Sequence, residues 1–202
     1  IGEKEKVGLI GSNATGKTTL FKLITGAMES DQGGVYLGKD CKIGYLEQHA
    51  CEGSPRTLYD ELESVFDTLK NIERRLEELA DLIEKGEVDL DSAIAEQTEL
   101  QTQFEDGGGL TFRSRTRSAL LGLGFSEADF SLKCTQLSGG QRSKLSLGKL
   151  LLSSPDLLLL DEPTNHIDLV SLEWLEEFLR VYRGSAIIIS HDRYFLDKVT
   201  TK

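Results

Sequence analysis

One apolar run near the carboxyl end constrains the fold of this 202-residue chain more than any other segment. Four consecutive leucines, Leu157 to Leu160, are followed directly by Asp161 and Glu162. A short run without polar alternation is typical of a strand buried on both faces of a parallel sheet. Open α/β sheets bind their ligands at the carboxyl ends of such strands. The run therefore predicts an α/β protein with both acids in its site, although a solvated turn after a strand would look the same.

A second segment, Gly11 to Thr18, reads GSNATGKT and has the pattern of a phosphate-binding loop. It follows the apolar run Val7 to Ile10 and opens a helical pattern between Leu20 and Ile24, so strand, loop and helix come in the required order. In such loops backbone amides cradle the phosphates, the lysine neutralises them and the next hydroxyl binds Mg²⁺. We therefore predict that nucleotide is bound by Gly11, Ser12, Asn13, Ala14, Thr15, Gly16, Lys17, Thr18 and Thr19.

A third segment, Leu137 to Gln141, reads LSGGQ and stands before another helical pattern, from Leu145 to Leu151. Ser138 is placed as an N-cap, and the two glycines after it leave the helix start bare. Exposed amides at the positive end of a helix dipole form an anion site. An ordinary Ser-Gly-Gly turn fits the same residues equally well. The candidates for contact with a nucleotide here are Ser138, Gly139, Gly140 and Gln141.

The order and spacing of these segments resemble the nucleotide-binding domain of ABC ATPases. The three segments are similar, in chain order, to the Walker A loop, the ABC signature and the Walker B strand. Tyr45-Leu46-Glu47-Gln48 is similar to the Q-loop, and Ser190-His191-Asp192, after the apolar run Ala186 to Ile189, to the H-loop. Taken singly, Gln48 would be a surface residue and His191 a turn or capping histidine. The resemblance implies a P-loop NTPase fold of the ABC type, with a mainly parallel sheet flanked by helices.

The resemblance also implies a role for each polar residue of the site. Glu162 activates the attacking water, His191 contacts the γ-phosphate, and Gln48 contacts both that water and the metal. Asp161 and Thr18 are the other expected ligands of Mg²⁺. Adjacent acids suit these different roles, because one carboxylate can hold the ion while the next polarises a water. The expected activity is hydrolysis of ATP to ADP and phosphate.

A partner domain is a further implication of the resemblance. In the ABC sandwich two ATPase domains lie head to tail, and each ATP is held by the phosphate loop of one domain and the signature of the other. Ser138 and Gly140 would therefore serve the ATP of the second domain, while Lys17 serves that of its own. ATP binding closes the sandwich and hydrolysis reopens it. We expect weak ATPase activity from this domain alone.

The residues after the Walker B strand and those of the H-loop are most similar to the ABC-F group, whose members have two tandem ATPase domains and no membrane domain. These residues are PTNHID at Pro163 to Asp168 and SHDRYFL at Ser190 to Leu196. Many ABC-F proteins act on the ribosome, so a ribosomal protein, rRNA or tRNA is the implied partner. Two positions depart from the usual pattern. Ile167 replaces a leucine conservatively, and Ala14 replaces a common glycine, which would weaken nucleotide binding if the backbone there must be left-handed.

Composition agrees with a cytoplasmic protein that has no membrane span. No run approaches the ~18 to 20 apolar residues of a transmembrane helix, and no signal peptide opens the chain. The three cysteines form no Cys-x-x-Cys pair, which indicates reduced thiols at Cys41, Cys51 and Cys134.

The phosphate loop begins at residue 11, which leaves no room for the antiparallel sheet and the adenine-stacking aromatic residue that precede it in ABC domains. We therefore expect an excised piece of a longer protein. Such a piece would bind ATP more weakly. It would also expose a sheet edge prone to self-association, with a homodimer as one outcome.

The region between the Q-loop and the signature has a helical periodicity of its own. An alternating spacing of four and three residues predicts one continuous helix, about 39 Å long, at Leu58, Leu62, Val65, Leu69, Ile72, Leu76, Leu79 and Ile83. Gly86 would end it, and a weaker pattern through Ile94, Leu100 and Phe104 predicts a second helix docked along the first. Part of this region is the ordinary helical subdomain of an ABC domain. The excess resembles the arm inserted in the first ATPase domain of ABC-F proteins.

These assignments divide the chain into an ATPase core at residues 1–51 and 137–202 and a helical subdomain at residues 52–136. The arm hairpin is expected at about residues 56–106. Acidic charge is concentrated there. Residues 52–106 carry 17 acidic and 5 basic side chains, a net charge of −12 against −11 for the whole chain, which leaves +1 for the remainder.

An acidic hairpin is not expected to grip phosphate backbones, so a basic ribosomal protein is the better partner for it. Arg113, Arg115 and Arg117 are the nearest candidates for phosphate contact, although a solvated helix face fits them as well. Two other function classes remain open. The motor domain of a membrane transporter would leave the hairpin unexplained, and a nucleotide-gated scaffold without catalysis is disfavoured by Glu162.

Overall fold

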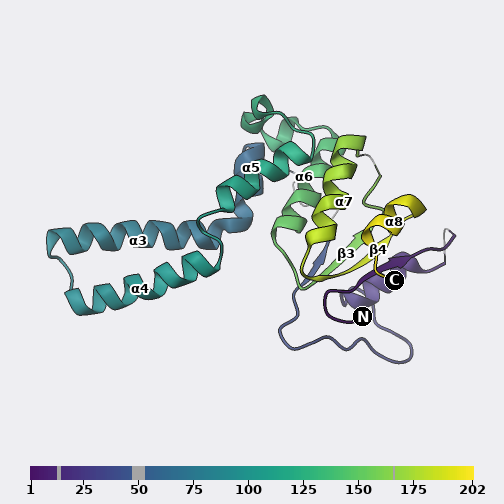
Figure 1. The fold of residues 1–202 in the computed structure, drawn as a ribbon, viewed down its shortest axis with the longest axis horizontal. Coiled ribbons are helices and arrows are strands. Elements are labelled where there is room, and N and C mark those ends of the chain that lie inside the picture. Colours follow the sequence, from purple (N-terminus) through teal and green to yellow (C-terminus); the bar gives the residue numbers. More distant parts are fainter. Residues whose placement is uncertain (13–14, 47–52, 166) are drawn as a thin grey trace.

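The computed structural model of the chain describes residues 1–12, 15–46, 53–165 and 167–202 (Figure 1). Four strands form one parallel sheet in the order β1-β4-β3-β2. Their bounds are β1 Lys6–Leu9, β2 Ile43–Tyr45, β3 Leu157–Asp161 and β4 Ser185–Ile189. The carboxyl ends of β1 and β3 both lie beside Ile189, because Leu9 and Asp161 are its partners on the two sides. The predicted α/β fold with a parallel sheet is confirmed.

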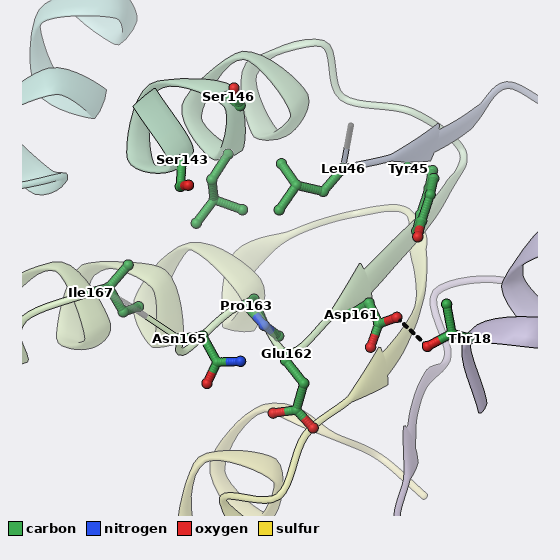
Figure 2. A pocket seen from close by; sticks show the side chains of 11 residues that line it. Thr18, Tyr45, Leu46, Ser143, Ser146, Asp161, Glu162, Pro163, Asn165 and Ile167 are labelled. Carbon is green, nitrogen blue, oxygen red and sulfur yellow. Dashed lines mark hydrogen bonds between the residues drawn. The ribbon is translucent and has the colours of Figure 1, made fainter. Parts of the chain in front are cut away.

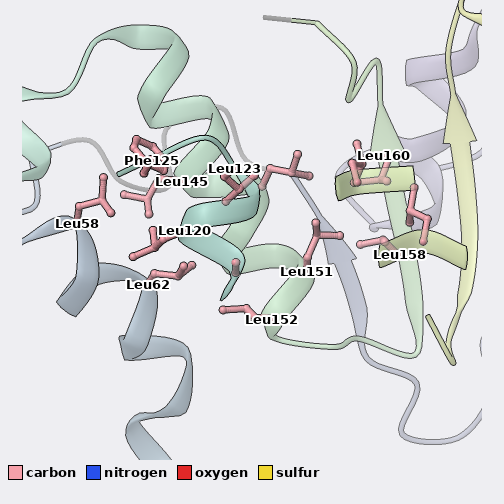
Figure 3. Packing of buried hydrophobic residues seen from close by; sticks show 14 of the residues in the cluster. Leu58, Leu62, Leu120, Leu123, Phe125, Leu145, Leu151, Leu152, Leu158 and Leu160 are labelled. Carbon is pink, nitrogen blue, oxygen red and sulfur yellow. The ribbon is translucent and has the colours of Figure 1, made fainter. Parts of the chain in front are cut away.

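The leucine run forms the central strand β3, and it is buried on both faces as predicted. Alternate side chains point to opposite faces of a strand. Leu158 and Leu160 join the larger hydrophobic cluster, which also includes Leu62, Leu120 and Leu151 (Figure 3). Leu157 and Leu159 join the smaller cluster on the other face, together with Phe21. Helices on both faces therefore exclude water from β3.

Four helices complete the sheet layers, namely α1 Lys17–Ile24, α6 Gly139–Leu152, α7 Leu169–Val181 and α8 Arg193–Val199. Three of them begin at a polar N-cap whose side chain accepts a hydrogen bond from a backbone amide of the first turn. These caps are Ser138 for α6, Asp168 for α7 and Asp192 for α8. The fourth, α1, begins differently, because its N-cap Gly16 has a left-handed backbone with φ 89°. Among the described residues, no helix combines the length and apolar character needed to cross a bilayer.

The segment between β2 and α6 is helical, and its pair of helices at residues 67–106 projects from the rest of the molecule (Figure 1). It contains α2 Leu58–Glu63, a 3₁₀ turn at Ser64–Phe66, α3 Asp67–Lys85, α4 Leu90–Asp106 and α5 Phe112–Gly122. Two further 3₁₀ turns, Glu127–Ser131 and Cys134–Gln136, lead to the signature segment. We use the word arm for the antiparallel pair α3 and α4.

The prediction of one continuous helix from Leu58 to Ile83 is wrong. The chain leaves the α-helix at Ser64, whose hydroxyl donates to the carbonyl oxygen of Glu61 at 2.7 Å. Phe66, which lies off the predicted seam, turns into the core and is 6% exposed. Its ring packs on Phe112 of α5 with a centroid distance of 5.6 Å. The helix breaks there because its packing partner changes. The residues before the turn pack on α5 and α6, whereas those after it pack on α4.

The arm forms as predicted in its main features. Gly86 ends α3 in a left-handed conformation with φ 67°. Leu79 of α3 is 1% exposed and Ala93 of α4 is 4% exposed, so both are buried. Arg75 of α3 makes two hydrogen bonds to Glu96 of α4, at 2.8 and 3.2 Å. Ile94, a member of the weaker pattern that predicted this second helix, is 48% exposed, and the buried residue beside it is Ala93.

Candidate functional site

The side chains of Thr15 and Lys17 donate hydrogen bonds to carbonyl oxygens of the phosphate loop. The ammonium group of Lys17 donates to the carbonyl oxygens of Gly11 at 2.7 Å and Ser12 at 2.8 Å. The hydroxyl of Thr15 donates to the same carbonyl of Ser12 at 2.9 Å. An ammonium group has three donors, and two of them are used by these carbonyl oxygens within the described part of the chain. Gly16 then gives the left-handed turn from which α1 starts.

The loop meets the end of the central strand through a side-chain contact. The hydroxyl of Thr18 donates to the Oδ2 atom of Asp161 at 2.7 Å, across 143 positions of sequence (Figure 2). Thr18 lies in the first turn of α1, and Asp161 is the last residue of β3. Two oxygen ligands of the kind that Mg²⁺ prefers are therefore already in contact.

Glu162 follows directly and is held by the neighbouring strand. Its backbone N–H donates to the carbonyl oxygen of Ile189 at 2.9 Å, and its φ of 50° is left-handed. Its Oε1 atom is buried and has no hydrogen-bond partner within the described part of the chain. The Nε2 atom of His191 lies 3.4 Å from that oxygen. A buried carboxylate oxygen without a hydrogen bond is suited to accept one from a water molecule.

A cavity of about 370 Å³, which we call the phosphate cavity, brings the predicted residues of both strands and the loop together. Its lining consists of Thr15, Gly16, Lys17, Thr18, Thr19, Asp161, Glu162, Ile189 and His191. Asn13, Ala14 and Gln48 lie outside the described residues, as do Cys51 and His166. The left-handed backbone suspected at Ala14 therefore stays a prediction.

A second cavity of about 410 Å³, the side cavity, opens from the same carboxylates toward α6 (Figure 2). Sequence reasoning missed most of its lining, including Ser143, Ser146 and Asn165. The two serines are three positions apart on a helix, which places them on one face, so the helical pattern contained that signal. Tyr45 also lines it and packs edge-on against Phe21, with ring centroids 5.9 Å apart. Burial, and secondarily the charge of Asp161, raises the pKa of the Tyr45 hydroxyl.

The described residues contain no group of three or more His, Cys, Asp or Glu side chains arranged to hold a metal ion. Mg²⁺ commonly takes one or two protein oxygens together with phosphates and water. The side chains of Thr18 and Asp161 have oxygens of this kind.

The signature segment is placed apart from the phosphate cavity. Ser138 and Gln141 form a reciprocal capping box, because the Gln141 amide donates to the Ser138 hydroxyl at 3.3 Å and the Ser138 amide donates to the Gln141 side chain at 2.9 Å. A Cβ atom built on Gly139 or Gly140 would meet nothing within 4 Å, so both glycines face open space. None of the described residues 138–141 lines either cavity.

The three arginines of α5 have partners inside the molecule. Arg113 makes two hydrogen bonds to Glu73 of α3, at 2.8 and 2.6 Å. Arg117 pairs with Glu127. Arg115 lies over the ring of Phe66, 5.1 Å from its centroid. Contact with a phosphate backbone would compete with these interactions, so they disfavour that role for Arg113 and Arg117.

Comparison with known proteins gives several matches. A family model described as "ABC transporter" matches residues 1–165. The chain is 45% identical to the ATP-binding protein YdiF of Bacillus subtilis, covering 100% of this chain and 32% of YdiF. It is 40% identical to ABC transporter F family member 2 of Arabidopsis thaliana, covering 98% of this chain and 30% of that protein.

A third relative is the energy-dependent translational throttle protein EttA of Escherichia coli K12. The chain is 38% identical to EttA, covering 96% of this chain and 35% of EttA. The chain thus spans about a third of the length of the curated relatives it matches.

Solved structures share the fold at lower identity. The crystal structure of the complex of the archaeal ribosomal stalk protein aP1 and the archaeal ribosome recycling factor aABCE1 matches with a TM-score of 0.67 and 20% identity, over 99% of this chain and 31% of that one. The dimeric ATP-binding cassette MJ0796, bound to ADP and Pi, matches with a TM-score of 0.59 and 21% identity, over 98% of this chain and 80% of that one. At these identities the likeness concerns the fold.

Proposed function

This chain belongs to the ABC family of ATPases, and from that premise we propose that it is the first ATPase domain of an F-type protein that uses ATP to change its state on the ribosome, in the cytoplasm. One observation carries the ATPase part of the proposal. Thr18, Asp161, Glu162 and His191 converge on one cavity from the phosphate loop and the ends of two strands. These side chains are the set that phosphate transfer to water requires.

Each residue has a place in the chemistry that follows from its contacts. Lys17, whose ammonium group lies against the carbonyl oxygens of the phosphate loop, neutralises the phosphates. Glu162 orients and deprotonates the attacking water through Oε1, which lies beside the imidazole of His191. In the proposed site His191, which lines the same cavity beside Glu162, contacts the γ-phosphate. Thr18 and Asp161 would hold Mg²⁺, which when bound neutralises charge on the phosphates.

We assign the signature residues to the ATP of a second domain, in a head-to-tail sandwich. Support comes from their placement, since Gly139 and Gly140 face open space and lie outside both cavities. The capping box leaves other amides of the first turn for an anion that approaches from outside. Gln48 completes the proposed site as a contact of Mg²⁺ and of the water.

The ribosomal part of the proposal rests on the arm and on one relative. The arm resembles the insertion of F-type proteins, and EttA, at 38% identity, is named a translational throttle. We propose an ATPase core at residues 1–51 and 137–202 and a helical subdomain at residues 52–136 that carries the arm. The acidic charge of the arm favours a basic ribosomal protein as its partner over rRNA or tRNA backbone.

The experiment uses the full-length protein with Glu162→Gln and the matching change in its second domain. Without the base, ATP stays bound and the sandwich stays closed, so we expect ATP-dependent co-sedimentation with ribosomes and loss of ATP hydrolysis. Glu173→Gln, an exposed acid of α7, is the matched control and should hydrolyse ATP normally.

A motor domain of a transporter is the second candidate, because the matching family model is described as "ABC transporter", but the F-type relatives favour it less. Recovery of the trapped protein only with membranes would support that candidate. Equal ribosome binding with ATP and with ADP would contradict an ATP-driven switch.

A further inference from the structure

Glu61 is a buried carboxylate outside the ATP site, and both of its oxygens are engaged. The residue is 4% exposed and lies in α2, directly before the turn that leads into the arm. Its Oε2 atom accepts a hydrogen bond from the hydroxyl of Ser54 at 2.6 Å. Its Oε1 atom accepts one from the ammonium group of Lys149. Leaving a buried carboxylate without partners costs free energy, so these contacts hold α2 in place.

Lys149 belongs to the helix that starts at the signature. Helix α6 runs from Gly139 to Leu152, about 21 Å at 1.5 Å per residue. Its first turn carries the residues predicted to meet the second domain's ATP, and Lys149 lies in its last turn. The ion pair with Glu61 joins positions 88 apart in the sequence. One end of α6 therefore faces a nucleotide site and the other end holds the base of the arm.

The side chain of Leu62 in α2 also approaches the backbone of α6 closely beside this ion pair. A Cβ atom built on Gly148 would lie 3.3 Å from a methyl group of Leu62 and 2.6 Å from one of Leu123. Positions 61 and 62 of α2 thus contact positions 149 and 148 of α6. Well-packed interfaces of this kind move as units and do not deform continuously.

The arm is fixed to α2 and α5 on the far side of the turn. Lys70 of α3 pairs with Glu63 of α2 at 3.0 Å. Arg113 of α5 makes two hydrogen bonds to Glu73 of α3. The ring of Phe66, in the turn, packs on the ring of Phe112 in α5. These contacts join α3 to α2 and α5 across the turn.

We propose that Glu61 is the positioning residue that couples the signature helix α6 to the arm, so that a displacement of α6 on ATP binding moves the arm as one body. Burial alone would raise the pKa of the Glu61 carboxyl, but the hydrogen bonds from Lys149 and Ser54 lower it overall. Glu61 is thus held as the charged carboxylate that forms the ion pair with the ammonium group of Lys149. The inference rests on the proposed function for the ATP-driven displacement itself.

The test measures the distance between the arm and the ATPase core in the full-length protein. Spectroscopic labels are placed at Glu84→Cys near the arm tip and Glu173→Cys on α7, both exposed positions. The background carries Glu162→Gln in order to trap the ATP state. We expect ATP to shift this distance in the parent protein, and we expect the shift to be lost in Glu61→Gln, which keeps the side-chain shape but not the charge.

Two further variants separate coupling from general stability. Lys149→Met removes the other charge at the more exposed end of the pair, where the side chain is 25% exposed, and should lose the shift as well. The double variant should be no worse than either single one, because partners in one interaction are not additive. Glu176→Gln breaks a similar ion pair between α7 and α8, in which Glu176 is 13% exposed, and should keep the shift.

ATP affinity provides the readout that distinguishes coupling from damage to the site. Glu61 lines neither cavity, so Glu61→Gln keeps the side chains that contact ATP and should still bind it. A shift of parental size in Glu61→Gln or Lys149→Met would overturn the inference and leave the proposed function intact. Absence of any ATP-driven shift in the parent would overturn both.

Discussion

Glu162 carries the proposed water activation in a backbone conformation that non-glycine residues rarely adopt. Its φ of 50° costs about 1–2 kcal/mol, and such strain is typical of functional sites. The hydrogen bond from its N–H to Ile189 extends the pairing of β3 and β4 by one residue and then turns the chain. This turn keeps Oε1 near His191. The acid itself was predicted from the sequence, but its conformation was not, because that conformation depends on β4.

Asp168 is expected to make stability depend on acid pH. Its carboxylate caps α7 by accepting from the Ser171 amide at 2.9 Å and also pairs with Lys144. The hydrogen bond from Lys144, followed by that from Ser171, lowers the pKa of Asp168 well below its usual range. A lowered folded-state pKa contributes stability above the ordinary value of about 4. That contribution is lost as the pH falls through the folded-state pKa.

Asp168→Asn keeps a side chain that can cap the helix but removes the charge. At pH 7 we expect a loss of at most about 1 kcal/mol, because the side chain is half exposed. Below about pH 4 the free energy of unfolding should fall less steeply in the variant than in the parent. Urea unfolding at a series of pH values measures both effects. Parallel curves for the two proteins would contradict the assignment.

The helices α2 and α3 illustrate how one sequence pattern can serve two packing partners. Their apolar residues keep an unbroken spacing of four and three, yet the chain bends at Ser64–Phe66. Leu58 and Leu62 are fully buried in the cluster with α5 and α6, whereas Leu79 is buried against α4. Periodicity identifies which residues are buried, but a helix can be interrupted wherever the packing partner changes. Phe66 marks that point.

Leu79 is expected to determine the stability of the arm. Leu79→Ala should destabilise the hairpin by about 2–5 kcal/mol, because the side chain is 1% exposed and its loss leaves a cavity. Ile94→Ala on the facing helix is the control, and it should cost less than about 1 kcal/mol at 48% exposure. Hydrogen exchange should accelerate at residues 67–106 in the Leu79 variant, while the sheet keeps its protection. Uniform acceleration across the molecule would show that the arm does not unfold by itself.

The whole molecule presents two half-sites that do not meet each other. The phosphate loop, Asp161, Glu162 and His191 line one cavity, whereas Ser138 to Gln141 lie outside it. Helix α6 connects the signature to the base of the arm. The chain spans about a third of its relatives' length. On the proposed function, each half-site would be completed by a second copy of the domain or by the second domain of the full protein.

ATPase activity of the isolated 202-residue domain should therefore be weak and should increase per molecule with protein concentration. Association supplies the signature from another copy, and its extent follows mass action. Turnover measured over a range of concentrations, beside the full-length protein at equal site concentration, tests this expectation. Ser138→Ala with the parent domain at equal amounts should lower turnover without changing the nucleotide affinity of the phosphate loop. Turnover equal to that of the full-length protein at all concentrations would contradict it.

The amino-acid sequence by itself determined the features that depend on near neighbours. The buried strand at Leu157 to Leu160, the cap at Ser138 and the stop at Gly86 all followed from residues a few positions apart. The tertiary structure alone decided which distant residues meet. Thr18 reaches Asp161 across 143 positions, and Glu61 reaches Lys149 across 88. Periodicity and propensity describe one element at a time, whereas these contacts depend on how whole helices pack on the sheet.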